Sequence, residues 1–189
     1  MKTKKNLSKE RTLILAKPDA VERGLVGDIL NRFERADFKL VGIKMSKPNA
    51  AHINKHYLPT KAQLNAMGNK TIESLRRFGY DVKKFMGTED PMEIGRIINR
   101  WNIDFLTSGP VVAMVFQGFD AVAKGRKIVG ATMPGAAEIG TIRGDFSSDA
   151  PPLANGQKRA VRNLVHASGA VDEAEREIKH WFSTMELVG

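Results

Sequence analysis

The chain has 189 residues, of which 42% are hydrophobic and 27% charged, and its formal net charge at pH 7 is +9. This balance is typical of a folded globular chain and excludes a disordered or fibrous segment. The absence of cysteine excludes disulfide frameworks, thiolate zinc sites, iron–sulfur clusters and cysteine nucleophiles. The longest stretch without a charged residue, Phe105–Phe119, has 15 residues, fewer than the roughly 18 apolar residues of a membrane span. We expect a cytoplasmic protein with one domain over residues 10–189.

The N-terminus is the most basic part of the chain. Residues 1–11 contain five basic residues and one acidic residue. No aromatic side chain that could stack on a base is interleaved with them, and no hydrophobic segment with a cleavage site follows. We therefore predict a flexible basic tail over residues 1–9. An arm that binds nucleic acid is the secondary interpretation.

The sequence before residue 46 predicts a strand, a helix and a second strand. Thr12–Ala16 is a short β-favouring run that ends in a turn at Pro18, so Lys17 lies at the end of a strand. Residues 24–33 repeat apolar side chains at the spacings of an amphipathic helix. Phe38–Met45 alternates apolar and polar residues, as a half-buried strand does.

The middle of the chain predicts helices. A short helix that carries His56 and Tyr57 is followed by residues 58–105, which form a helical insert. Within this insert, Lys61–Arg77 is a polar helical segment and Pro91–Leu106 a second helix, with a break at a glycine between them.

The remainder of the chain repeats the strand, helix and strand order. Pro110–Phe116 is a buried type of strand, Asp120–Val129 has helical spacing, and Gly130–Gly144 is a glycine-rich loop. Asn163–His166 is a last apolar run before an amphipathic helix over Val171–Phe182. Two such halves predict an α+β, ferredoxin-like sandwich. In it a four-stranded antiparallel sheet is covered on one face by helices, with a helical insert.

Candidate phosphate ligands stand at the ends of these elements. The chain has neither a P-loop nor a G-x-G-x-x-G after a strand, which excludes those two nucleotide folds. Lys17, Arg126, Thr132 and Arg143 nevertheless combine cations, a hydroxyl and neighbouring glycines in a pattern that favours a polyphosphate. His166 stands among small residues just before the last helix.

Several segments, taken in order, resemble nucleoside diphosphate kinases. The segments are KPDA (17–20), RGLVG (23–27), SGPVVAMV (108–115), GATMP (130–134), GTIRGDF (140–146) and RNLVHAS (162–168), together with Tyr57, Glu177 and Trp181. The resemblance covers roughly residues 10–57 and 106–188 and is highly specific. It implies a ferredoxin-like fold and a kinase that moves the γ-phosphate of ATP to nucleoside diphosphates through a phosphohistidine.

The resemblance also implies roles for individual residues. His166 would be the phosphorylated nucleophile, Glu177 would orient it, Ser168 would support that glutamate, and Lys17 completes the catalytic set. The residues implied around the nucleotide are Lys17, Tyr57, Arg126, Thr132, Arg143 and Asn163. Mg²⁺ would arrive on the nucleotide phosphates, because the sequence contains no all-protein metal cage. A homo-oligomer, either a hexamer or a tetramer, is also implied.

The chain departs from the family pattern near the histidine and in two insertions. Ala167 and Val161 stand where the family usually has glycine, and Gly169 stands where it usually has aspartate. Residues 147–160 form an extra loop, and the insert over 58–105 lacks an assignable aromatic platform for the base. Aromatic candidates for that platform are Phe78, Tyr80 and Phe85. The alternative function is a catalytically silent relative that binds nucleic acid or another anionic partner through its basic surface.

Overall fold

One antiparallel sheet organises the computed structural model, which describes residues 9–188. Within that range it has four strands, β1 (Glu10–Ala16), β2 (Lys39–Ser46), β3 (Val111–Gly118) and β4 (Val165–Ala167). Their order across the sheet is β2-β3-β1-β4, and every pairing is antiparallel. This order confirms the predicted ferredoxin-like sandwich. Except for Lys9, the predicted basic tail over residues 1–9 lies outside the described residues.

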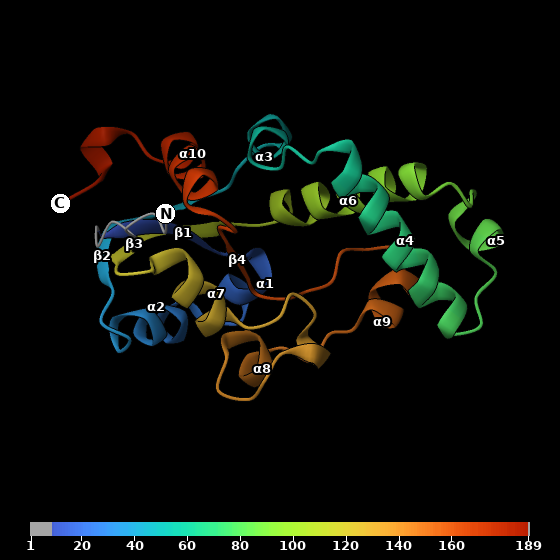
Figure 1. The fold of residues 1–189 in the computed structure, drawn as a ribbon, viewed down its shortest axis with the longest axis horizontal. Coiled ribbons are helices and arrows are strands. Elements are labelled where there is room, and N and C mark those ends of the chain that lie inside the picture. The colour runs from blue at the N-terminus through green and yellow to red at the C-terminus, as the bar shows by residue number, and fades with distance from the viewer. Residues whose placement is uncertain (1–8, 189) are drawn as a thin grey trace, which may run out of the picture.

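Helices cover both faces of the sheet (Figure 1). Helices α2 (Val26–Glu34) and α7 (Ala121–Val129) pack on one face, whereas α3 (Ala50–His56), α10 (Val171–Trp181) and the end of α6 (Pro91–Thr107) pack on the other. The expectation of helices on one face only is therefore wrong. The reason is that the central strands β1 and β3 are apolar at successive positions, so both sheet faces present side chains that must be buried.

The turn predicted after the first strand is a one-turn helix, α1 (Pro18–Glu22). Proline at the first helical position has the backbone angle that a helix needs and lacks an N–H that would remain unpaired there. The sequence signal for a turn and for a helix start is the same at this position. The consequence is that Lys17 becomes the residue preceding the helix, at the C-terminal end of β1.

The insert is a helical arm with its own small core. Helices α4 (Lys61–Arg77), α5 (Val82–Met86) and α6 extend away from the sheet (Figure 1). Their buried apolar core contains Ile72, Leu75, Val82 and Ile94. The α4 helix begins at a capping box, in which Thr60 and Gln63 satisfy each other's backbone N–H groups. The predicted helix over 61–77 is confirmed to the residue.

The predicted extra loop over 147–160 contains a helix, α9 (Pro151–Gly156), which lies against α4. Two prolines in its first turn fix the backbone angles that the helix needs. The glycine-rich stretch over 130–144 holds the short helix η1 (Pro134–Ala136) and the beginning of α8 (Ile142–Phe146), and the chain closes with η2 (Thr184–Glu186). In the described part of the chain no helix combines the length and apolar character that a membrane crossing needs.

Candidate active site

His166 lies on β4, paired with Leu15 of the central strand β1. Leu164, two residues before His166, has a φ of 66°, in the left-handed region that leucine rarely adopts. Asp19 holds it there, because its Oδ2 accepts a hydrogen bond from the Leu164 N–H at 3.1 Å. The Leu164 carbonyl in turn accepts from the Lys17 N–H at 2.7 Å. Local strain is thus retained beside the histidine, where strained backbone commonly marks a functional site.

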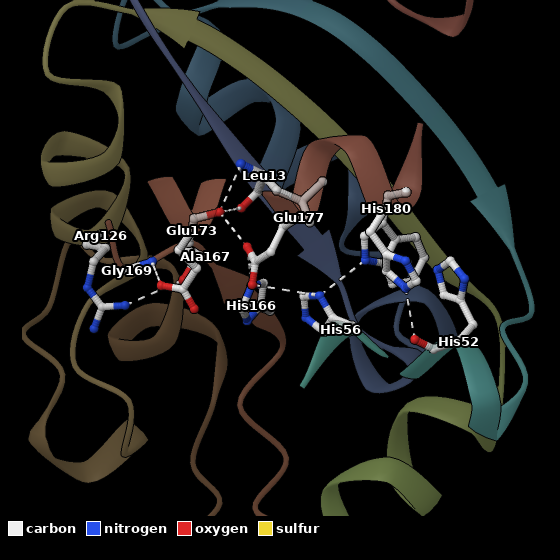
Figure 2. Close-up of polar contacts among 12 residues, drawn as sticks. Leu13, His52, His56, Arg126, His166, Ala167, Gly169, Glu173, Glu177 and His180 are labelled. Carbon is white, nitrogen blue, oxygen red and sulfur yellow. Dashed lines mark hydrogen bonds and ion pairs between the residues drawn. The ribbon is translucent and has the colours of Figure 1, made fainter. Parts of the chain in front are cut away.

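Behind His166 lies the carboxylate of Glu177 (Figure 2). The histidine Nε2 is 3.1 Å from each carboxylate oxygen, and Ser168 donates a hydrogen bond from Oγ to Oε2 at 2.6 Å. Burial alone would raise the pKa of Glu177, but its hydrogen bonds to His166 and Ser168 outweigh burial and lower it. An ionised Glu177 keeps the proton of a neutral imidazole on Nε2, which leaves Nδ1 with its lone pair free.

A cavity of about 600 Å³ opens in front of the histidine. Its lining includes seven of the nine residues that the sequence predicted for the site, namely Lys17, Tyr57, Arg126, Thr132, Arg143, Asn163 and His166. The other two, Glu177 and Ser168, are buried behind His166. The fold therefore brings all nine residues together from α7, α8, β4 and α10 and from the connecting segments, with Lys17 directly after β1 and Tyr57 directly after α3.

The cations of the cavity are held by polar neighbours. Lys17 donates from Nζ to Asn163 Oδ1 at 2.7 Å, and Arg143 donates to the carbonyl oxygens of Gly130, Asn163 and Val165. Burial lowers the pKa of Lys17 to about 8, helped by the charge of Arg143. Burial and the charge of Arg126 lower the pKa of Arg143 to about 10. Both groups are still cationic at neutral pH, and a polyphosphate would relieve their mutual repulsion.

A second histidine, His56, was not predicted as a site residue. Its ring packs edge-on against that of His166, with 4.5 Å between the ring centroids, and its Nδ1 accepts a hydrogen bond from the Trp181 indole. Burial lowers its pKa, so the ring is neutral and its proton lies on Nε2. The only sequence signal was its position directly before Tyr57.

Within residues 9–188, the ligand atoms of His56, His166 and Glu177 lie within 4.8 Å of one another, close enough for a metal ion. Each of them is already engaged in the hydrogen bonds just described. The group is consequently a hydrogen-bonded support for His166, and we assign it no metal.

The far wall of the cavity is built by the two insertions. Met67, Lys70 and Thr71 of α4 line it together with Asn155 of α9 and Arg159. The predicted aromatic candidates are not brought to this wall: Phe78 and Tyr80 are exposed, and Phe85 packs against Tyr80 in the arm. Phe78 and Tyr80 lie in the connection between α4 and α5, Phe85 lies on α5, and none of the three belongs to the cavity lining.

Comparisons with known proteins agree with this geometry. The sequence model described as "Nucleoside diphosphate kinase" matches residues 10–73 and 95–187. The chain is 48% identical to a nucleoside diphosphate kinase of Pyrobaculum aerophilum over 95% of its length and 98% of the relative's. It is 40% identical to a nucleoside diphosphate kinase of a Synechococcus strain, over 94% of this chain and 89% of the relative.

Two solved structures are similar to this chain over nearly its whole length. The crystal structure of an NDP kinase from Pyrobaculum aerophilum superposes with a TM-score of 0.93 at 46% identity, covering 96% of this chain and all of that one. A nucleoside-diphosphate kinase from Borrelia burgdorferi, a transition-state mimic with bound vanadate and ADP, superposes with a TM-score of 0.76 at 30% identity. That match covers 97% of this chain and 93% of the other.

Proposed function

The chain belongs to the nucleoside diphosphate kinase family, and on that premise we propose that it moves the γ-phosphate of a nucleoside triphosphate such as ATP to a nucleoside diphosphate through His166. The observation that carries the proposal is the pairing of His166 Nε2 with Glu177 at 3.1 Å. That pairing leaves Nδ1 of a residue lining the cationic cavity as the free nucleophile.

The reaction runs in two steps. In the first, the lone pair of His166 Nδ1 attacks the γ-phosphorus while the bond from that phosphorus to the bridging oxygen breaks, and the nucleoside diphosphate leaves with the bonding electrons. In the second, a terminal oxygen of another nucleoside diphosphate attacks the phosphorus, and the imidazole leaves. One site serves donor and acceptor in turn, so the kinetics are ping-pong.

Lys17, Arg126 and Arg143 supply the positive charge that phosphoryl transfer needs on the non-bridging oxygens. Glu173 is the one carboxylate among the described residues of the cavity lining, so the lining does not form a metal cage of its own. Mg²⁺ would be held by the nucleotide phosphates, where it supplies further neutralisation of their charge. The protein residues position the phosphates around it.

The partners we propose are nucleoside tri- and diphosphates and further copies of this chain. The exposed Ile43 and Met45 on the edge strand β2 support self-association into a tetramer or hexamer. We propose the cytoplasm as the compartment, because the chain has no cysteine. Nucleic acid is a secondary partner at most.

The test is to incubate the protein with Mg-ATP labelled at the γ-phosphate, look for acid-labile label on the protein and chase with unlabelled GDP. Wild type should become labelled and should lose the label to GDP, whereas His166→Ala should take up none. His52→Gln is the matched control, because His52 stacks on His180 outside the cavity and should not affect labelling.

Retained transfer in His166→Ala would contradict the proposal. If wild type binds nucleotide but takes up no label, the alternative of a catalytically silent relative is favoured. That alternative predicts tight binding to DNA or RNA that weakens steeply as salt rises.

A further inference from the structure

Glu173 is an acidic side chain in the cavity lining to which neither the sequence nor the proposed reaction gives a role. It is the third residue of α10, and its Oε2 accepts a hydrogen bond from the Gly169 N–H at 2.8 Å. The residue before α10, Ala170, has no side chain that could accept from the free N–H groups of the helix. Glu173 therefore reaches back from the first turn of α10 and pairs an N–H group of the loop that joins α10 to β4, the strand that carries His166.

The carboxylate occupies the space beside Gly169. A Cβ atom at position 169 would lie 2.7 Å from Glu173 Oε2 and 4.0 Å from Arg126 Nη1. Gly169 is not among the glycines with positive φ, so its backbone would accept an ordinary side chain, and the obstacle is the Glu173 carboxylate.

Arg126 approaches the same point from the other side (Figure 2). Its Nη1 donates a hydrogen bond to the carbonyl of Ala167, at 3.4 Å, and the rest of the side chain is exposed at the cavity. A single long hydrogen bond holds an exposed guanidinium weakly. A carboxylate nearby attracts the guanidinium and limits its motion before the phosphate arrives.

We propose, resting on the proposed function, that Glu173 is a positioning residue whose carboxylate, supplied from α10, fills the space beside Gly169 at the edge of the phosphate cavity. It acts through two neighbours. It holds the backbone at Gly169, three residues after His166, and it orients Arg126 toward the phosphates. A carboxylate introduced at position 169 would occupy the same space, because a Cβ there would lie 2.7 Å from Glu173 Oε2.

The test removes the carboxylate at position 173 and introduces one at position 169, singly and together. Each variant is measured for kcat/KM, for ADP affinity by calorimetry and for the melting temperature. Glu173→Ala should lower kcat/KM and ADP affinity by roughly tenfold, since a hydrogen bond to a charged group is lost together with the orientation of Arg126. Gly169→Asp alone should not improve on wild type, because the two carboxylates would compete for one space. In the Glu173→Ala background, Gly169→Asp should restore at least half of the loss. The same substitution thus improves one background and not the other.

Two further variants separate charge from capping. Glu173→Gln keeps an oxygen for the Gly169 N–H, so it should hold the melting temperature but lose ADP affinity. Asp172→Ala removes the neighbouring first-turn acid, which is exposed, and should leave kcat/KM within about twofold of wild type. If Glu173→Ala does not fold, Gly169→Asp is placed in a Glu173→Ser background, whose short side chain also leaves the space beside Gly169 empty, with the same rescue expected.

The proposal is overturned if Glu173→Ala lowers only the melting temperature, or if Gly169→Asp gives no rescue in either Glu173 background. Both results are judged against an active wild type. An inactive wild type would instead count against the proposed function, since every comparison among Glu173 variants starts from a working enzyme.

Discussion

Charged side chains in this site are buried deeply enough that their neighbours set their protonation. Lys17 is 8% exposed and Glu177 is 1% exposed. Burial works against the charged form of both. For the carboxylate, the hydrogen bonds from His166 and Ser168 prevail and its pKa falls. For the ammonium group burial prevails, and its pKa also falls. Lys17 therefore loses its charge in mildly alkaline solution, whereas Glu177 loses its charge only in acid.

Lys17 should produce an alkaline limit of activity. Its pKa of about 8 means that the free enzyme loses this cation, and with it affinity for phosphates, as pH rises through about 8. Profiles of kcat/KM from pH 6.5 to 9.5 should fall with a midpoint near this value. The kcat profile should fall at higher pH, because bound phosphates raise the pKa of the lysine.

The matched variant is Lys17→Met, which cannot lose a proton. It should have a lower kcat/KM throughout and no fall near pH 8. A fall that persists in Lys17→Met would assign the alkaline limit to another group.

Ser168→Ala should destabilise the protein in a pH-dependent way. Glu177 has a lowered folded pKa, so its contribution to stability is present above its unfolded value of 4.5 and is lost as pH falls through the folded pKa. Removing the Ser168 hydrogen bond raises that folded pKa. The expected loss is about 1.5–3 kcal/mol at pH 7 and less near pH 4, measured by urea unfolding. Ser108→Ala, which removes a hydroxyl bonded only to a carbonyl, should show no such pH dependence.

At the scale of elements, the arm depends on close contact between α4 and α6. A Cβ at Gly68 would lie 1.8 Å from the Pro91 carbonyl oxygen, and one at Gly95 would lie 2.0 Å from that of Leu64. These distances mean that the two helix backbones touch where glycine has no side chain. The contact holds α4 in place, and α4 carries one wall of the cavity.

Gly68→Ala should therefore force the helices apart. We expect a loss of at least about 1–3 kcal/mol in thermal unfolding followed by circular dichroism, together with weaker ADP binding. Gly27→Ala is the matched control, because a Cβ there meets nothing within 4 Å and α2 is an ordinary helix. It should change stability by no more than about 1 kcal/mol, in the favourable direction. Equal effects of the two substitutions would rule out the contact as the cause.

At the scale of the whole molecule, one edge of the sheet exposes apolar side chains that nothing in the single chain covers within residues 9–188. Strand β2 lies at the edge, where Val41 accepts a hydrogen bond from the Val188 N–H of the C-terminal segment. Farther along this strand, Ile43 is 48% exposed and Met45 62% exposed. An edge strand with apolar side chains is a surface on which a second copy can add its own strand.

Sedimentation equilibrium should consequently give a mass that is a multiple of 20.9 kDa. Ile43→Lys places a charge on the edge and should reduce that mass toward the single chain. Lys39→Glu, on the same strand but at its exposed start, is a control for charge alone. A wild type that sediments as a single chain would contradict self-association.

The sequence by itself determined the strands and most helices, because those signals are local. The runs at Thr12–Ala16 and Pro110–Phe116 and the helix at Lys61–Arg77 are predicted by spacing and composition, and each lies within one or two residues of its observed element. The identity of the site residues came from resemblance to a family, since a lone histidine or arginine has no local signature. The helix at Pro151 was missed because two prolines favour a loop as strongly as a helix start.

Only the tertiary structure decided which side chains share a space. That both sheet faces are covered, that His56 touches His166 and that the aromatic residues of the arm do not line the cavity all depend on how distant elements pack. Glu173 illustrates the reason most directly. Its sequence position suggests an ordinary first-turn acid, and its closeness to Gly169 and Arg126 follows from the packing of α10 and α7 against the sheet. Distances between segments far apart in the chain are not contained in local spacing, so only the folded arrangement could identify that carboxylate as part of the site.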